Sequence, residues 1–351
     1  MTSQTLTLAD LGWSNFFMTQ LDLQDLANLK PMRVSEVQRS IVRALAEDGI
    51  HNLTMPPNMT TGELAVGDWV LVNPETQRVT RYLERRSIFG RKSAGPEQRQ
   101  QFIAANIDTI FIVSSCNTDF NPARLERYIA LASESGAQPV IILTKSDTVE
   151  NVEDYENQAR AISPLADVIA LNAKDPDQLG KLEPWCGKGQ TIALVGSSGV
   201  GKSTLTNGLA GTSIDTGEIR EDDAKGRHTT TNRALYRMTS GGWLIDTPGM
   251  REIGVQQAAE GIDAVFADIV ELAMACHFND CAHNSEPGCA VQGAITSGTL
   301  DPDRLHRWQK LQREDEINTE TLAQRHARSR GKEQLYKAGR AKGKAKRGYL
   351  S

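Results

Sequence analysis

The spacing of hydrophobic and polar positions changes near residue 100. From Met32 to about Lys92, short stretches of alternating apolar and polar residues are broken by Gly, Pro and Asn, as in "RVSEVQ", "IVRALAEDG", "LAVGDWVLVN" and "RVTRYL". Short strands at close intervals are typical of a small barrel or sandwich. Residues 1–31 carry irregularly spaced apolar positions, and we expect an N-terminal extension with one short helix.

After Gln100, predicted strands alternate with predicted helices. The apolar run "TIFIV" is followed by Asn121-Pro122, an N-cap and a first-turn proline, and Gly136 is expected to end that helix. The run "VIIL" then completes a βαβ unit with parallel strands. Further strands are expected at "DVIAL" and "TIALV", with a helix near 154–162 and a hairpin from "RALYRM" and "WLID". This pattern predicts a central α/β domain.

The segment "GSSGVGKS" fits the phosphate-loop pattern, with a strand entering it and a helix leaving it. Its glycines allow backbone N–H groups to turn toward phosphates, and the helix N-terminus adds partial positive charge. We expect Lys202 to reach the β- and γ-phosphates and Ser203 to ligate Mg²⁺. The alternative is a glycine-rich turn without a ligand. The predicted cradle consists of Gly196, Ser197, Ser198, Gly199, Val200, Gly201, Lys202, Ser203 and Thr204.

Two further segments bear on magnesium and hydrolysis. In "WLIDTPG", Asp246 is expected to bind Mg²⁺ through water, and Gly249 to present its N–H to the γ-phosphate. In "GRHTTT", Thr229 or Thr230 would complete the Mg²⁺ shell, and the spacing does not choose between them. The catalytic candidates are Lys202, Thr230 and His228; the histidine is either a group that positions the attacking water or an ordinary solvent-facing residue.

Two loops after other predicted strands are suited to reading a guanine base. In "TKSD", the Asp147 carboxylate can accept hydrogen bonds from guanine N1–H and N2–H₂, whereas adenine offers no such pair. The second loop, "NAK", resembles an S-A-K loop whose backbone contacts guanine O6, with Asn in place of Ser. Thr144 stands where Asn is commoner, and both changes are expected to loosen the contacts between loops. The predicted base contacts are Thr144, Lys145, Asp147, Asn172, Ala173 and Lys174.

The base-reading motifs precede the phosphate loop, which reverses the usual order. A site is a spatial constellation, and the carboxyl ends of strands in an open α/β sheet can converge on one crevice whatever their order in the chain. The sequence therefore predicts a circularly permuted GTPase domain that binds GTP and GDP with Mg²⁺. An ATP-dependent kinase or transporter subunit is disfavoured by Asp147.

The cysteines are unevenly distributed, since Cys116 and Cys186 are isolated while the other three cluster around a histidine. A Cys₃His set has the ligand count and softness that structural zinc prefers. The alternative is three reduced cysteines beside a chance histidine. We predict one structural zinc per chain, held by Cys276, Cys281, His283 and Cys289 in a C-terminal, mostly helical domain.

The chain has 351 residues, a net charge of −5, no run of 18 apolar residues and no signal peptide, so a cytoplasmic protein without a membrane partner is expected. From Arg325 onward, the sequence contains ten lysine or arginine residues and one acidic residue, Glu333. This excess of positive charge predicts either a polyanionic partner or a solvated tail. Candidate phosphate contacts in the barrel are Arg81, Arg85, Arg86, Arg91 and Lys92; Trp69, Tyr82 and Phe89 are either base-stacking residues or core.

The order TKSD, NAK, GSSGVGKS, GRHTTT, DTPG and Cys-x₄-Cys-x-His-x₅-Cys, from about Arg33 to about Gln312, resembles the RsgA/YjeQ family of small-subunit-dependent GTPases. The resemblance implies a multi-domain chain with an N-terminal OB-fold barrel, a circularly permuted P-loop GTPase domain and a zinc domain. It also implies a role in late maturation of the small (30S) ribosomal subunit, rRNA binding through the barrel and zinc domains, and hydrolysis stimulated by the subunit.

The expected divisions of this monomer are an extension at 1–31, a barrel at 32–98, a GTPase domain at 99–256, a zinc domain at 257–324 and a basic tail at 325–351. An alternative is an RNA- or ribosome-binding module in which nucleotide turnover is incidental.

Overall fold

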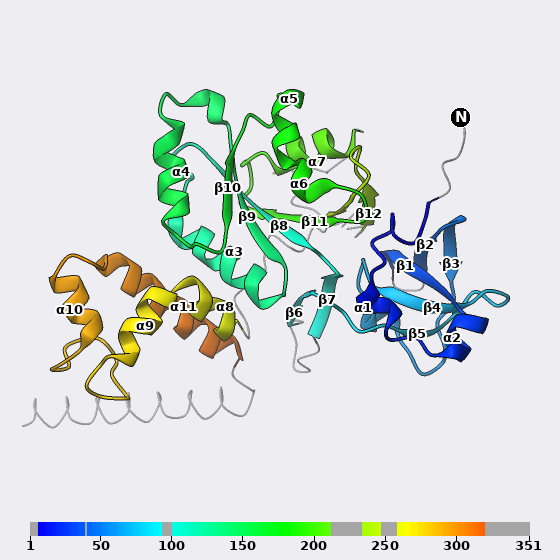
Figure 1. Ribbon diagram of the computed structural model, residues 1–351, viewed down its shortest axis with the longest axis horizontal. Coiled ribbons are helices and arrows are strands. Elements are labelled where there is room, and N and C mark those ends of the chain that lie inside the picture. The colour runs from blue at the N-terminus through cyan, green and yellow to red at the C-terminus, as the bar shows by residue number, and fades with distance from the viewer. Residues whose placement is uncertain (1–5, 39–40, 93–99, 212–233, 247–257, 320–351) are drawn as a thin grey trace, which may run out of the picture.

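The computed structural model describes residues 6–38, 41–92, 100–211, 234–246 and 258–319, shown in colour in Figure 1. The strands are β1 (Lys30–Val37), β2 (Val42–Ala46), β3 (Gly49–Leu53), β4 (Trp69–Asn73), β5 (Arg78–Tyr82), β6 (Ile88–Lys92), β7 (Gln100–Ala105), β8 (Thr109–Ser115), β9 (Gln138–Thr144), β10 (Asp167–Ala170), β11 (Thr191–Gly196), β12 (Ala234–Arg237) and β13 (Trp243–Asp246). The α-helices are α1 (Asn15–Met18), α2 (Leu23–Asn28), α3 (Pro122–Glu134), α4 (Val152–Arg160), α5 (Pro176–Leu179), α6 (Glu183–Cys186), α7 (Lys202–Ala210), α8 (Ala259–Val265), α9 (Ala267–Met274), α10 (Ala290–Thr296) and α11 (Pro302–Thr319).

Strands β1 to β5 form a small barrel. Strand β1 pairs antiparallel with β2 and β4, β2 pairs with β3, and β4 pairs with β5. A single bridge between Thr54 and Arg78 then connects the end of β3 to the start of β5. The ring order β1-β2-β3-β5-β4 is that of an OB-type Greek-key barrel, so the N-terminal barrel prediction is confirmed. Strand β3 was not anticipated, because "GIHNL" has few apolar positions and is set by its hairpin with β2.

The central sheet has the strand order β10-β9-β8-β11-β13-β12. All pairs from β10 to β13 are parallel, and only the β12–β13 hairpin is antiparallel. The chain enters in the middle of the sheet at β8, moves outward to β10, and returns to β11 on the other side of β8. The predicted βαβ unit and hairpin are therefore confirmed, and the rotated chain order is built into the sheet.

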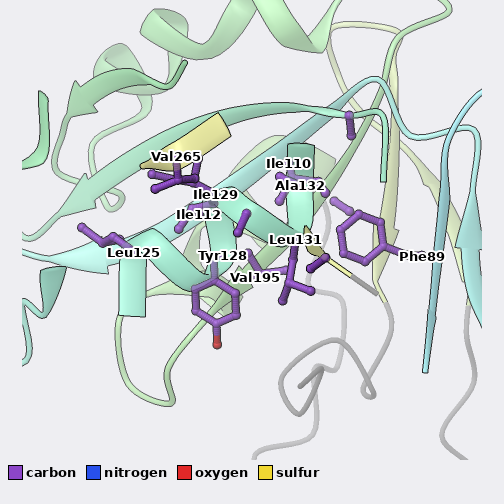
Figure 2. Packing of buried hydrophobic residues seen from close by; sticks show 14 of the residues in the cluster. Phe89, Ile110, Ile112, Leu125, Tyr128, Ile129, Leu131, Ala132, Val195 and Val265 are labelled. Atoms are coloured by element: carbon purple, nitrogen blue, oxygen red, sulfur yellow. The ribbon is translucent and has the colours of Figure 1, made fainter. Parts of the chain in front are cut away.

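Alternate residues of the strands face two helical layers. On β8, Ile110 and Ile112 belong to a core shared with α3 and α4, whereas Phe111 and Val113 belong to a core shared with α6 and α7. Figure 2 shows Ile110, Ile112 and Ile129 in the first of these cores. Because both faces are covered, the strands read as continuous apolar runs rather than as alternating ones.

Helix α3 starts and ends as its sequence predicts. The Asn121 side chain accepts a hydrogen bond from Arg124 N at 3.1 Å, Pro122 occupies the first turn, and Gly136 follows the helix with φ of +82°. Val265 of α8 packs against the outer side of α3 (Figure 2).

The C-terminal helices are attached to α3 through a buried carboxylate. Glu126 is fully buried and accepts hydrogen bonds from Arg304 at 3.3 Å and Arg307 at 2.8 Å, both on α11. The Arg304 guanidinium also pairs with Asp268 of α9 at 2.7 Å. This network adds directional contacts to the apolar packing between α3 and α8, and the predicted helical C-terminal region is confirmed.

The N-terminal extension contains two short helices, α1 and α2, rather than one. In Figure 1, α2 lies on the side of the barrel away from the central sheet, and it is the residues before the helices that reach that sheet. The fully buried Arg33 of β1 donates to Leu11 O and to Thr191 Oγ1, each at 2.7 Å, and Trp243 Nε1 donates to Asp10 O at 2.7 Å. The barrel, the extension and the first residue of β11 therefore share one hydrogen-bonded junction.

Two other features connect the barrel with the central sheet. Glu36 of β1 pairs with Ala234 of β12, so the two sheets are continuous. Strands β6 and β7 form a separate antiparallel hairpin, whose two strands lie on either side of the boundary predicted at 98/99.

Candidate functional site

The predicted phosphate loop connects β11 to α7, as expected from its sequence. Gly196, Gly199 and Gly201 have φ of +144°, +77° and +98°. A Cβ on Gly196 would lie 2.2 Å from the carbonyl oxygen of Val113 on the neighbouring strand. Only glycine can therefore start this loop so close to β8.

The Lys202 ammonium lies inside the loop that it follows. The side chain is buried and donates hydrogen bonds to the carbonyl oxygens of Gly196, at 2.8 Å, and Ser197. Ser203 follows it in the first turn of α7 and is half-buried. A cation and a helix N-terminus thus meet at one point, an arrangement that suits a phosphate group.

The loop after β9 is hydrogen-bonded directly to the phosphate loop. Thr144 is buried at the end of β9, and its Oγ1 lies 2.5 Å from the carbonyl oxygen of Val200 and 3.1 Å from that of Ser114. A hydroxyl group can donate only one hydrogen bond, and we assign it to the Val200 carbonyl oxygen because that contact is the shorter of the two. Threonine therefore keeps a direct contact between the two loops here, and the expected loosening relative to asparagine stays a prediction.

The rest of the "TKSD" loop turns sharply toward solvent. Lys145 adopts the left-handed conformation with φ of +58°. A short 3₁₀ helix, Ser146–Thr148, follows, and Asp147 is exposed within it. The carboxylate is therefore accessible to a ligand at the edge where β9 ends.

The "NAK" loop follows β10 beside this turn, and Ser146 N lies 3.5 Å from Leu171 O. Asn172 Oδ1 accepts from Lys174 N at 3.0 Å, so the loop closes as an Asx turn. The Gln178 side chain, which the sequence analysis did not single out, accepts from Asn172 N at 2.9 Å. The available signal was the spacing Asp175-Pro-Asp-Gln178, which matches a helix N-cap followed by a capping-box glutamine.

Asp246 is the last residue of β13, and the pairing of Ile245 with Ala193 brings this strand end to the same edge of the sheet. Its side chain lies outside the described part. The predicted residues His228, Thr229, Thr230 and Gly249 also lie outside the described residues. The structure therefore brings together the predicted residues after β9, β10 and β11, and places Asp246 by its backbone.

The four predicted zinc ligands converge in the C-terminal helical region. Their ligand atoms lie within 4.8 Å of one another. His283 Nδ1 is 3.6 Å from Cys276 Sγ and 3.5 Å from Cys289 Sγ, and the two sulfurs are 3.9 Å apart. A tetrahedral zinc with Zn–S of about 2.3 Å and Zn–N of about 2.0–2.1 Å requires separations of about 3.8 Å between sulfurs and about 3.6 Å between S and N.

The surrounding backbone holds this cluster in shape. His283 has φ of +57°, and its carbonyl oxygen accepts from Gln292 Nε2 at 2.6 Å. Cys289 is the N-cap of α10, and the Trp308 ring of α11 lies 5.7 Å from the imidazole. The cluster thus has the donor types of a structural zinc site. Cys276, His283 and Cys289 also have the spacing of its ligands, with Cys281 Sγ within 4.8 Å of them.

The structure alters the interpretation of several barrel residues that were predicted to contact RNA. Trp69 and Phe89 are buried in the core, so their interpretation as stacking residues is wrong. The Arg85 side chain is only 11% exposed and forms two hydrogen bonds with the buried Asp68, so it is a structural residue rather than a free phosphate contact.

Two of the other predicted phosphate contacts, Arg81 and Arg86, are paired but remain partly exposed. Arg81 pairs with Asp25 and Arg86 with Asp108, and both side chains keep 40% exposure. Tyr82 is exposed, with the Arg85 guanidinium 5.3 Å from its ring centre. The side chains of Arg91 and Lys92 lie outside the described part. In the described ranges, no helix has the length and apolar content needed to cross a bilayer.

Comparisons with known proteins agree with this geometry. The sequence model of the family described as RsgA GTPase matches residues 82–256. A model described as ABC transporter matches residues 180–337, a range that includes the phosphate loop. The fold is similar to the crystal structures of YjeQ from Thermotoga maritima (TM-score 0.60, 23% identity, 81% of this chain and 97% of that one) and of YloQ, a circularly permuted GTPase (TM-score 0.56, 24% identity, 84% and 97%).

Full-length relatives are more similar in sequence. The small ribosomal subunit biogenesis GTPase RsgA of Mesorhizobium japonicum is 53% identical over 323 residues, which cover 91% of this chain and 93% of the relative. A protein of Vibrio parahaemolyticus named small ribosomal subunit biogenesis GTPase RsgA 2 is 48% identical over 327 residues, covering 92% and 90%. The expected family is confirmed: this chain belongs to the RsgA GTPase family.

Proposed function

We propose that this protein hydrolyses GTP and acts in the biogenesis of the small ribosomal subunit, the role stated in the names of its relatives. The observation that carries the nucleotide part is the contact between Thr144 and Val200. Through it, a loop suited to guanine and a loop suited to phosphate meet at the carboxyl edge of a parallel sheet, the edge at which ligands bind in such folds.

In this proposal the loops after β9 and β10 read the base. Asp147 accepts from guanine N1–H and N2–H₂, and the Lys145 stem lies along the ring. The loop Asn172–Lys174 faces O6. The cradle Gly196–Thr204 surrounds the phosphates, and Lys202 neutralises their charge.

We propose Ser203, Asp246 and Thr229 as ligands of a magnesium ion, because Mg²⁺ prefers oxygen donors of this kind. When bound, the ion supplies charge neutralisation at the β- and γ-phosphates. Zinc is proposed at Cys276, Cys281, His283 and Cys289, with a structural role, because the four protein ligands complete a tetrahedron.

For hydrolysis we propose slow intrinsic turnover that the small subunit accelerates. Ras-like proteins place a glutamine after DTxG to orient water, and Met250 stands at that place here. The proposed water-positioning group is His228 or a group of the ribosome, with Thr230 as a further candidate beside Lys202. If His228→Ala leaves the stimulated rate unchanged, the role of the histidine is dismissed.

The proposed setting is a cytoplasmic monomer that binds rRNA through its barrel and zinc domains, with the divisions 1–31, 32–98, 99–256, 257–324 and 325–351. The exposed Arg81 and Arg86 and the basic tail favour an anionic partner. Affinity for the small subunit should then fall steeply as salt concentration rises. An affinity independent of salt would contradict this role of the basic groups.

The central test is single-turnover GTP hydrolysis with increasing amounts of purified small subunits. The proposal expects strong stimulation and preference for GTP over ATP. Asp147→Lys should abolish GTP binding, whereas Glu150→Lys, an identical charge reversal at an exposed position three residues later, should retain it. Stimulation that is absent while binding persists would favour the binding-module alternative, in which turnover is incidental.

A further inference from the structure

The side-chain amide of Gln178 joins two parts of the loop after β10. Its Oε1 accepts a hydrogen bond from Asn172 N at 2.9 Å, and its Nε2 donates to Asp175 Oδ2 at 2.9 Å. Asp175 is also the N-cap of α5, with Oδ1 accepting from Asp177 N at 3.0 Å. The glutamine thus closes the loop against the helix that follows it.

These bonds leave one amide of the loop available. Asn172 N is used by Gln178, and Lys174 N donates to Asn172 Oδ1 at 3.0 Å. Within the part of the chain that the structure describes, Ala173 N has no hydrogen-bond acceptor. Ala173, which is buried, is therefore the one residue of Asn172–Lys174 whose amide these bonds leave without an acceptor.

Helix α5, which carries Gln178, is placed against the helix of the phosphate loop. Leu179 fits beside Gly208 of α7, where an added Cβ would lie 2.5 Å from Leu179 Cδ1. A glycine inside a helix costs about 1 kcal/mol relative to alanine, and the close approach of α5 gives it a physical reason here. The packing of α5 therefore fixes the position of Gln178 relative to α7, the helix that begins at Lys202.

We propose that Gln178 is a positioning residue for recognition of the guanine O6 atom. It holds Asn172 so that Ala173 N–H points to the ligand. This inference rests on the proposed function, in which the loop after β10 faces O6. Without the glutamine, Asn172 N loses its acceptor and the loop is no longer closed against α5.

The test compares GTP with 6-thio-GTP, which keeps N1–H and N2–H₂ but replaces O6 with sulfur, a weak acceptor. Dissociation constants of both nucleotides and of ATP are measured by calorimetry for the full-length protein and for Gln178→Met. The wild type should prefer GTP over 6-thio-GTP. The variant should bind GTP about tenfold more weakly. The ratio of its dissociation constants for 6-thio-GTP and GTP should fall toward one.

The matched control is Gln138→Met, which removes a side-chain hydrogen bond to Asp167 at the opposite end of β9. It should retain the wild-type preference. Because Gln178 is only half-buried, its variant is expected to fold, and thermal unfolding is followed alongside; Gln178→Ala repeats the comparison with a smaller side chain.

A preference that stays at the wild-type value in both Gln178 variants, whether or not the affinities fall, would overturn the assignment and leave the residue a purely structural role. Equal binding of GTP and 6-thio-GTP by the wild type would overturn it as well, with the selection of GTP over ATP intact. Equal binding of GTP and ATP is a different result, because it removes the proposed function itself.

Discussion

The hydroxyl of Thr144 lies 2.5 Å from the carbonyl oxygen of Val200, although the two residues are 56 positions apart. The first ends a strand whose loop is suited to a base, and the second belongs to the phosphate loop. This hydrogen bond links the two halves of the proposed nucleotide site across the sheet order β9-β8-β11.

Thr144→Val should weaken binding of GTP and GDP alike. The substitution keeps the shape of the side chain but leaves the buried Val200 carbonyl without its donor, a cost of about 1–2 kcal/mol, or roughly five- to thirtyfold in affinity. Calorimetry with both nucleotides measures it. Thr144→Ser keeps the hydroxyl and serves as control, and unchanged affinity in the valine variant would show that the contact does not position the loops.

Removal of zinc should expose the three cluster cysteines selectively. Cys116 and Cys186 are buried in the two cores of the central sheet, so a thiol reagent reaches neither of them while that sheet stays folded. After chelation, a thiol reagent should react with Cys276, Cys281 and Cys289 while the other two stay protected.

The same treatment should lower the stability of the C-terminal helical region and weaken binding to small subunits while sparing GTP binding, because the cluster is separate from the nucleotide loops. Cys289→Ser should lose the metal measured by atomic absorption, whereas Cys186→Ala should retain it. Unchanged melting after complete removal of zinc would contradict a structural role.

The buried Glu126 should make the stability of the protein depend on pH. Burial is the main reason that its pKa is raised above the usual 4.5, against the opposing effect of Arg307 and Arg304. The folded state then keeps a proton that the unfolded state has released. Its contribution to stability is complete below pH 4.5 and is lost as the pH rises through the folded pKa.

Denaturant unfolding of the wild type and of Glu126→Gln between pH 4 and 7 checks this prediction. The free energy of unfolding of the wild type, relative to that of the glutamine variant, should decrease as the pH rises. A relative stability that increases with pH would mean that the arginines outweigh burial and lower the pKa.

Arg33→Met should loosen the junction between the barrel, the N-terminal extension and β11. It removes the donors to Leu11 O and Thr191 Oγ1, and we expect a loss of about 2–4 kcal/mol in the free energy of unfolding. Denaturant titration measures this loss, and limited proteolysis should cut near residues 6–20. Arg43→Met, on the neighbouring strand at an exposed ion pair with Glu36, should change stability by less than about 0.5 kcal/mol. Equal losses of unfolding free energy in the two variants would show that the hydrogen bonds of Arg33 do not stabilise the junction.

Local patterns were enough to predict many elements of the fold. The α3 boundaries follow from Asn121, Pro122 and Gly136, and the phosphate loop follows from three glycines whose positive φ no other residue adopts easily. The Cys₃His spacing likewise brought four donors to one point. In each case the residues that cause the structure lie within a few positions of one another.

Contacts between distant residues could not be predicted from the same patterns. Arg85 reads as a free cation in the sequence, yet it is paired with the buried Asp68. For Trp69 and Phe89 the sequence left two positions open, surface or core, and the structure places both in the core. The spacing of Asp175 and Gln178 indicates a helix N-terminus, but the packing of Leu179 of α5 beside Gly208 of α7 follows from no local pattern.

The amino-acid sequence alone thus determined which chemical groups the chain carries, which loops are shaped to hold phosphate, and which strands and helices present them. Only the tertiary structure decided that Thr144 meets Val200, that Arg33 joins the barrel to β11, and that Glu126 holds the C-terminal helices. The reason is physical: backbone conformation depends on near neighbours, whereas the partner of a buried polar group is set by how whole layers pack.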